Sequence, residues 1–188
     1  MMMSKIISTK SVADIKGRKI LFDTNVWIFI EGLNGQSSAH KHQLYTDAQS
    51  ILRSNGNTII VNEYILSEFC NRSIKLAYEF AKQADESGQE FMRFKEFRET
   101  EDFDAAAEVA RDTCLNMLDE CEFCSCHDKH YNIKDVLAEF ASQKIDMSDI
   151  FIKNHCQKEN YLLMTDDADY SSTGLDIITA NKKLLAMT

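Results

Sequence analysis

The sequence contains no proline and no apolar run of the length that a membrane-spanning helix requires. A helix needs about 20 consecutive apolar residues to cross a bilayer, so we expect no membrane span. Proline breaks helix interiors, and its absence permits long helices. Residues 1–8 also lack the extended apolar stretch of a signal peptide. We therefore expect a cytoplasmic protein with no membrane partner.

Positive charge is scarce, because 21 Lys and Arg residues stand against 30 Asp and Glu residues and leave a net charge of −9. This balance disfavours nonspecific binding of nucleic acid through the field of the whole molecule. It is compatible with a local basic rim, and it suits a site that concentrates divalent cations.

Disulfides are not expected either, although the chain contains six cysteines. Disulfide scaffolds are small secreted domains, and cytoplasmic thiols stay reduced. The 188 residues are enough for one domain with a sizeable core. No internal repeat or low-complexity segment divides them. We therefore treat 1–188 as a single domain.

Short apolar or β-branched runs alternate with helical patterns along the chain. Helices are expected at 39–54 and 63–86, and a third opens at 146–149. Strands are expected at 20–22, 58–61, 161–165 and 175–178. This alternation indicates an α/β fold with a central parallel β-sheet flanked by helices on both faces.

Three segments lie outside this alternation. Residues 1–17 have weak periodicity and are expected to form a peripheral arm. Residues 87–145 are expected to form a helical insertion of two or three helices, whose many acids indicate a solvated face. Within it, 121–130 has the composition of a turn-like connection. The tail at 181–188 is expected to form one helical turn.

Acidic residues follow the predicted strands. Asp23 comes directly after the first strand, and Asp166 and Asp167 follow the third. Glu68 lies two turns into the helix after the second strand, and Asp149 lies in the first turn of the helix that leads to the third. Ligands bind at the carboxyl ends of parallel strands, so we expect these acids at one edge of the sheet.

Each acid also has a structural explanation. Asp23 can cap the next helix, and Glu68 can pair with Arg72 one turn later. Asp146 and Asp149 can form a capping box, and Asp167 can be a turn residue. Clustered carboxylates repel one another and raise their pKa values, whereas a divalent cation neutralises them. Oxygen ligands without His or Cys favour Mg²⁺ or Mn²⁺.

Four short motifs that carry these acids resemble those of the PIN-domain ribonucleases, the family that includes the VapC toxins. The run at 23–28 (Asp-Thr-Asn-Val-Trp-Ile) is similar to the opening motif, and 65–72, with Ser-Glu-Phe at its centre, is similar to the glutamate motif. The run at 149–152 (Asp-Ile-Phe-Ile) resembles the third motif, and 163–170 resembles the fourth. Order, spacing and strand or helix context all agree.

The resemblance covers residues 18–75 and 145–180, and it leaves the middle of the chain unmatched. It implies a PIN-like fold with an enlarged helical middle section. It also implies a metal-dependent endoribonuclease that cleaves RNA phosphodiester bonds, with RNA as substrate. A cognate antitoxin and a second copy of the chain are partners that the family allows.

The resemblance also assigns residues. The catalytic residues, which are also the ligands of Mg²⁺ or Mn²⁺, would be Asp23, Glu68, Asp149 and Asp167. Two positions stay open: Asp166 competes with Asp167 as a ligand, and Asp146 competes with Asp149. In each pair we favour the second.

Side chains next to these acids would complete the site. Hydrogen bonds that orient the carboxylates are expected from Thr24, Asn25 and Thr165. Trp27 is expected in the core or in a groove wall, and not as a platform for bases. Phosphate contacts would come from cations near the motifs: Arg72, Lys75, Lys153 and Lys158.

Three other readings remain. A catalytically degenerate PIN fold would bind RNA or protein without cleavage. A haloacid-dehalogenase-like phosphatase also begins with Phe22-Asp23, but its nucleophile motif needs a second Asp where this chain has Asn25. Zinc ligand types crowd into one loop, where free thiols are the alternative: Cys121, Cys124, Cys126, His127 and His130.

Overall fold

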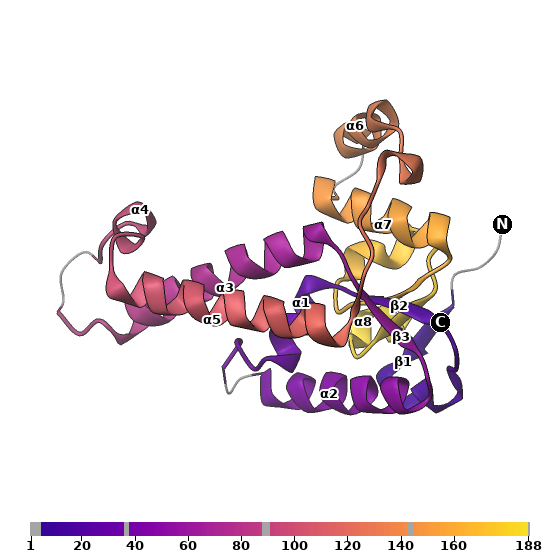
Figure 1. Ribbon diagram of the computed structural model, residues 1–188, viewed down its shortest axis with the longest axis horizontal. Helices are drawn as coiled ribbons and strands as arrows, with labels where there is room; N and C mark the ends of the chain where they lie inside the picture. The colour runs from indigo at the N-terminus through magenta and orange to yellow at the C-terminus, as the bar shows by residue number, and fades with distance from the viewer. Residues whose placement is uncertain (1–4, 36–37, 88–90, 143–144, 188) are drawn as a thin grey trace.

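A six-stranded sheet, parallel throughout, forms the centre of the molecule in the computed structural model, which describes residues 5–35, 38–87, 91–142 and 145–187 (Figure 1). The strands are arranged in the order β1-β6-β5-β2-β3-β4. Their bounds are β1 (Ile6–Ser8), β2 (Lys19–Phe22), β3 (Thr58–Val61), β4 (Glu122–Phe123), β5 (Leu162–Met164) and β6 (Ile177–Thr179).

Helices cover both faces of this sheet. Figure 1 shows α2 on one side of it and α7 on the other. The α-helices are α1 (Thr24–Ile30), α2 (Ala39–Ser54), α3 (Glu63–Ala84), α4 (Phe94–Phe97), α5 (Glu101–Glu120), α6 (Ile133–Ser142), α7 (Met147–Glu159) and α8 (Lys182–Leu185). Short 3-10 helices are η1 (Thr9–Asp14), η3 (Asp128–His130) and η4 (Ala168–Ser172).

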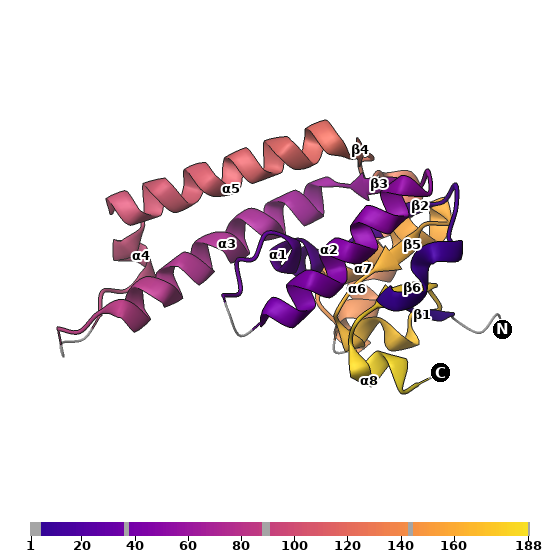
Figure 2. The ribbon, with the colours of Figure 1, turned by 90° about the horizontal axis from the view of Figure 1, so that it is seen from below.

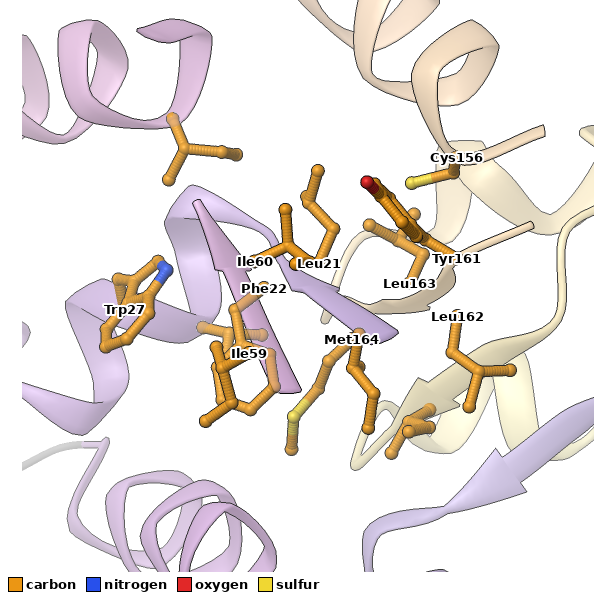
Figure 3. Packing of buried hydrophobic residues seen from close by; sticks show 14 of the residues in the cluster. Leu21, Phe22, Trp27, Ile59, Ile60, Cys156, Tyr161, Leu162, Leu163 and Met164 are labelled. Carbon is orange, nitrogen blue, oxygen red and sulfur yellow. The ribbon is translucent and has the colours of Figure 1, made fainter. Parts of the chain in front are cut away.

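The central strands are apolar because both of their faces are buried. All residues of β5 are buried, and so are all but the first residues of β2 and β3. Figure 3 shows side chains from these strands pointing to opposite faces, with Leu21 and Ile60 on one face and Phe22 on the other. Trp27 is 2% exposed and packs against Phe22 with ring centroids 5.5 Å apart, which confirms it as a core residue.

The strand order places a reversal point at β2. From β2 the chain passes through α1 and α2 to β3 on one side, and it returns later to β5 on the other side. In open parallel sheets such a reversal leaves a crevice beyond the carboxyl ends of the two strands, where ligands bind. The residues that follow β2 and β5 therefore meet at this crevice.

The middle of the chain forms an arm that extends away from the sheet. Figure 2 shows α3 and α5 side by side along this arm, with α4 near its far end. Aromatic rings pack together there, including Tyr78, Phe94 and Phe97. Most acids of α5 are exposed, as the charge pattern predicted. The sulfur atoms of Cys70 and Cys114 lie 3.5 Å apart between the two helices.

Several local features differ from the sequence-based expectation. The N-terminal segment contains β1, which forms an edge of the sheet by pairing with β6, and residues 121–130 contain β4 and η3. The last strand begins at Ile177 and not at 175. By contrast, Asp23 is the N-cap of α1, which is the structural role that the sequence allowed it. The last residue of the tail lies outside the described residues.

Two further findings concern the helices. The N-cap of α7 is Asp146, whose side chain makes no capping hydrogen bond, so the predicted capping box with Asp149 does not form. No helix within the described ranges is both long and apolar enough to cross a membrane.

The packing of α5 on α3 predicts a specific cross-link. Oxidised glutathione should convert the thiols of Cys70 and Cys114 into an intramolecular disulfide, releasing two molecules of reduced glutathione. Closing a loop of this length should raise the melting temperature by about 10 °C. Peptide mapping would identify the bond, and Cys70→Ser should remove both the bond and the stabilisation. A dominant pairing of Cys70 with any other cysteine would contradict this placement of α5.

Candidate active site

Asp23 occupies the centre of the crevice at the carboxyl ends of β2 and β5. Its backbone N–H donates a hydrogen bond to the carbonyl of Met164, 2.9 Å away, which ties the ends of the two strands together. The side chain is 4% exposed. It is the N-cap of α1, and its Oδ1 accepts a hydrogen bond of 2.7 Å from the backbone N–H of Thr24.

Three donors hold the Asp23 carboxylate in one orientation. Besides the Thr24 N–H, the amide of Asn25 and the hydroxyl of Thr165 each donate to Oδ2 at 2.6 Å. The pKa of Asp23 is raised to about 7, chiefly by burial. The nearby charges of Asp149 and Glu68 add to this rise, while the hydrogen bonds from Thr165 and Thr24 oppose it. Among the described residues, the Asp23 carboxylate thus lies near other acids and forms no ion pair.

Glu68 reaches the crevice from the second turn of α3. This helix begins at the cap residue Asn62, whose side chain accepts a hydrogen bond from the N–H of Ile65. The Thr24 hydroxyl donates to Glu68 Oε2 at 3.1 Å. Thr24 therefore links Asp23 to Glu68. On its other oxygen Glu68 pairs with Arg72 at 3.4 Å, as the one-turn spacing predicted.

Asp149 comes from the first turn of α7 and is partly buried. The hydroxyl of Tyr170 donates a hydrogen bond to its Oδ1 at 2.9 Å. The pKa of Asp149 is raised to about 6, chiefly by burial. The charges of Glu68, Asp167 and Asp146 add to this rise, and the hydrogen bond from Tyr170 opposes it. Asp149 and Asp23 therefore lie close enough to the other acids for their charges to interact.

Asp166 and Asp167 follow β5 but have different surroundings. The Asp166 carboxylate forms an ion pair with Lys41 and accepts a 2.7 Å hydrogen bond from the hydroxyl of Tyr45, and both of these partners lie on α2. Asp167 makes no such contact: its carboxylate caps η4 by accepting a bond from the N–H of Asp169. The oxygens of Asp167 are therefore more available to bind a cation than those of Asp166.

The three residues expected to orient the acids all contact them. The Thr165 hydroxyl donates to Asp23 and accepts from the N–H of Asp167 at 3.0 Å. Asn25 donates to Asp23, and its Oδ1 accepts from the N–H of Asp166 at 2.9 Å. One connected set of hydrogen bonds thus joins the residues after β2 to those after β5.

Sequence reasoning missed Tyr170 and Lys41, which contact Asp149 and Asp166. Tyr170 lies in the fourth motif, but nothing in the sequence indicates that η4 turns its ring back under α7. Lys41 lies 125 positions from Asp166, so only the packing of α2 brings them together.

The four cations predicted to contact phosphate have different surroundings in the structure. Arg72 lines a hollow of about 470 Å³ together with Asn25 and Asp167. Lys153 is buried and pairs with Glu139 of α6, so that contact prediction is wrong. Lys75 lines a separate hollow with Arg98, and Lys158 is an exposed residue in the last turn of α7.

The cysteine and histidine residues of 121–130 face different partners. His130 accepts the N–H of His127 on one ring nitrogen, and its other ring nitrogen lies 2.9 Å from Glu159. Cys126 points to the carbonyl of Phe151. Across the described ranges, no three His, Cys, Asp or Glu side chains are close enough as placed to hold a metal ion. This applies to the residues of the alternative zinc site and to the carboxylates of the crevice.

The donor chemistry of the crevice nevertheless suits a hard divalent cation. The groups that face one another are carboxylates, hydroxyls and amides, without a thiolate or imidazole. Burial is the main cause of the raised pKa values of Asp23 and Asp149, and repulsion from the neighbouring acids adds to it. A divalent cation would relieve this repulsion.

Comparison with solved structures identifies the fold. One similar structure is a chain of VapBC2 from Rickettsia felis, which was solved bound to a DNA fragment from the VapBC2 promoter. The match covers 87% of this chain and 99% of the R. felis chain, with a TM-score of 0.53 and 17% sequence identity. PAE2754 from Pyrobaculum aerophilum matches 90% of this chain and 89% of its own at 11% identity, with a TM-score of 0.45 that is too low to support an argument. No profile of a known protein family matches the sequence, and no curated protein matches it.

The fold is therefore PIN-like and similar to that of VapC, which confirms the fold class that the motifs predicted. It gives no support to the haloacid-dehalogenase alternative.

The burial of Asp23 predicts that stability depends on pH in metal-free protein. The pKa of Asp23 is about 7 in the folded chain and near 3.9 in an unfolded one. Its contribution to stability is thus fully present below about pH 4 and is lost as pH rises through 7. Relative to Asp23→Asn, the wild-type free energy of unfolding should fall by roughly 2 to 3 kcal/mol between pH 5 and pH 8.

Urea unfolding in EDTA at each pH measures this difference. Asp119→Asn, which changes an exposed acid of α5, is the matched control and should keep the wild-type slope. Parallel slopes for wild type and Asp23→Asn would show that Asp23 ionises normally in the folded chain.

Proposed function

We propose that this protein is a divalent-metal-dependent endoribonuclease that uses Mg²⁺ or Mn²⁺. The observation that carries the proposal is the crevice at the reversal point of the sheet. There, acids from four separate segments repel one another around the buried Asp23. Burying a carboxylate among other carboxylates is costly, so this arrangement is best explained by a cation that the site is built to receive. The PIN-like fold supports the same reading.

In this proposal Asp23, Glu68, Asp149 and Asp167 hold the cation. When bound, a divalent cation lowers the pKa of an attacking water and stabilises charge on the attacking and leaving oxygens of a phosphodiester. Asp23 is the fixed ligand, because its three donors restrict the rotation of its carboxylate. No Ser, Cys or His nucleophile is required.

The neighbouring residues position these ligands. Tyr170 keeps Asp149 directed into the crevice and lowers its pKa, which favours the ionised form that a ligand needs. The Thr24 hydroxyl sets Glu68 relative to Asp23. Arg72 supplies a positive charge at the edge of the crevice, where it can contact the substrate phosphate.

A partner that binds this protein is a further part of the proposal. The R. felis neighbour was solved as the complex VapBC2, and by analogy we propose a cognate antitoxin for this chain. The part of the arm formed by α4 and α5 would then decide which partner fits, because it belongs to the middle of the chain that the motifs do not match. Such an enzyme would act in the cytoplasm.

Substitution of the central acid tests the activity. Asp23→Asn should reduce Mg²⁺- or Mn²⁺-dependent cleavage of single-stranded RNA by more than about 100-fold, because even loss of a group that merely orients a ligand costs 10- to 100-fold. The fold should persist, since Asn occupies the same volume. Cleavage is followed on a labelled oligonucleotide with circular dichroism as the fold control, and Asp119→Asn should cleave normally.

Two results would contradict this proposal. Undiminished cleavage by folded Asp23→Asn would exclude the assigned cation site. Binding of RNA by the wild-type protein without cleavage in either metal would favour the degenerate, binding-only reading.

The different surroundings of Asp166 and Asp167 predict different effects for the same substitution. Asp167→Asn should weaken activation by Mn²⁺, seen as a higher metal concentration at half-maximal cleavage, with little change in melting temperature. Asp166→Asn should mainly lower the melting temperature by about 2 to 8 °C, because it breaks the contacts with Lys41 and Tyr45. The reverse pattern would move the fourth ligand position to Asp166.

A further inference from the structure

A basic groove lies next to the acidic crevice. It encloses about 700 Å³, and it is formed by the end of β1 and start of η1, the first turns of α2, and α8. We call this hollow the lysine groove. Its basic side chains are Lys10, His40, Lys41, Lys182 and Lys183. These segments lie far apart in the sequence, and α8 packs beside β1 in the folded chain.

The lysine groove is continuous with the crevice. The smaller hollow that contains Arg72 and Asp167 shares four lining residues with the groove: Phe29, Lys41, Asn181 and Lys183. Asn181 also donates a 2.6 Å hydrogen bond to the backbone carbonyl of Asp166. A ligand in the groove therefore extends directly to the acids.

The charge of the groove is unusual for this molecule, whose net charge is −9. Within the described part of the chain, Lys10, Lys182 and Lys183 take part in no ion pair, and all three are exposed. Like charges gathered around one hollow repel one another, and an anionic ligand relieves that repulsion. Lys41 is the exception, because it pairs with Asp166.

Apolar side chains also line the lysine groove. Phe29 lines both hollows, and its ring stacks on Tyr45 with centroids 5.6 Å apart, which fixes its orientation. Leu44 adds a second apolar surface. The groove combines cations with apolar side chains, and Lys41 Nζ lies over the Phe29 ring, 5.0 Å from its centroid. Such a lining suits a single-stranded nucleic acid, whose phosphates contact lysines while its bases lie on apolar side chains. An acidic peptide would use the cations but not the flat apolar surfaces.

We propose that the lysine groove binds the backbone of a single-stranded RNA where it leaves the crevice. This inference rests on the proposed function for the placement of the cleaved phosphate, while the binding itself is independent of cleavage. The groove thus provides a substrate path on α2 and α8, on the side of the crevice away from the α3–α5 arm.

Binding without metal tests the groove separately from catalysis. The probe is a fluorescein-labelled single-stranded RNA of 12 nucleotides, and anisotropy is measured in EDTA at several salt concentrations. The double variant Lys182→Gln/Lys183→Gln should raise Kd about 5- to 10-fold at low salt. It should also reduce the slope of log Kd against log salt by about 1.4, since each phosphate contact on a single strand contributes about 0.7.

The matched control removes the same charge elsewhere. Lys95→Gln/Lys134→Gln changes two exposed lysines on α4 and α6, and it should leave Kd and the salt slope within twofold of wild type. If both double variants weaken RNA binding equally, only the total charge of the protein matters, and the proposal that the lysine groove binds RNA is wrong. Unchanged binding by Lys182→Gln/Lys183→Gln would do the same.

Two competitors identify the class of ligand. A polyglutamate peptide or an RNA duplex of equal charge should compete at least 10-fold less well than the unlabelled single strand. Equal competition by the peptide would show that the groove binds an acidic protein segment. Equal competition by the duplex would show that the apolar side chains do not contact bases, and it would contradict the preference for a single strand. Groove-dependent binding in a protein that never cleaves would refute the proposed nuclease and leave the groove standing.

Discussion

The site depends on one buried carboxylate that has hydrogen-bond donors around it but no counter-charge. Asp23 can remain beneath the surface because a backbone N–H, an amide and a hydroxyl take the place of water around it. Hydrogen bonds of this kind favour the ionised form, yet burial outweighs them and the pKa rises to about 7. The fold thus supplies enough donors to fix the carboxylate in place, and too little positive charge to neutralise it. A proton relieves the remaining cost below about pH 7, and under the proposed function a divalent cation would do so above it.

The arrangement of the strands explains why this carboxylate lies where other acids can reach it. Because β2 has β3 on one side and β5 on the other, the chain crosses the sheet between them and both α3 and α7 begin near the carboxyl end of β2. Helix starts favour acidic side chains on electrostatic grounds. Asp149 is held there by Tyr170 and Glu68 by Thr24. Asp23 caps α1, Glu68 pairs with Arg72 and Asp167 caps η4, so these three acids keep the structural roles that their positions suggest. The crevice arises because their positions share one edge with that of Asp149.

This is also why the sequence predicted the centre of the fold well and its edges poorly. The strands β2, β3 and β5 are continuous apolar runs buried on both faces, and the sequence shows this directly. By contrast, β1 and β4 consist of three and two residues, and they are strands only because a neighbour offers its backbone for pairing. Lys153 could not be placed either, because its burial depends on Glu139 from a separate helix. Local patterns identify elements, whereas contacts between distant elements decide which charges remain available.

Asp166 and Asp167 show the same distinction at the scale of adjacent residues. The sequence gives two equivalent carboxylates after a strand, but successive residues of an extended chain point in opposite directions. One carboxylate therefore meets Lys41 and Tyr45 of α2, while the charge of the other acts on Asp149 across the crevice. By binding Lys41, Asp166 separates the repelling acids from the lysines of α8 and η1. If the proposed cation site and the proposed RNA groove both exist, they lie side by side in an acidic chain because the ion pair between Asp166 and Lys41 neutralises charge at the boundary between them.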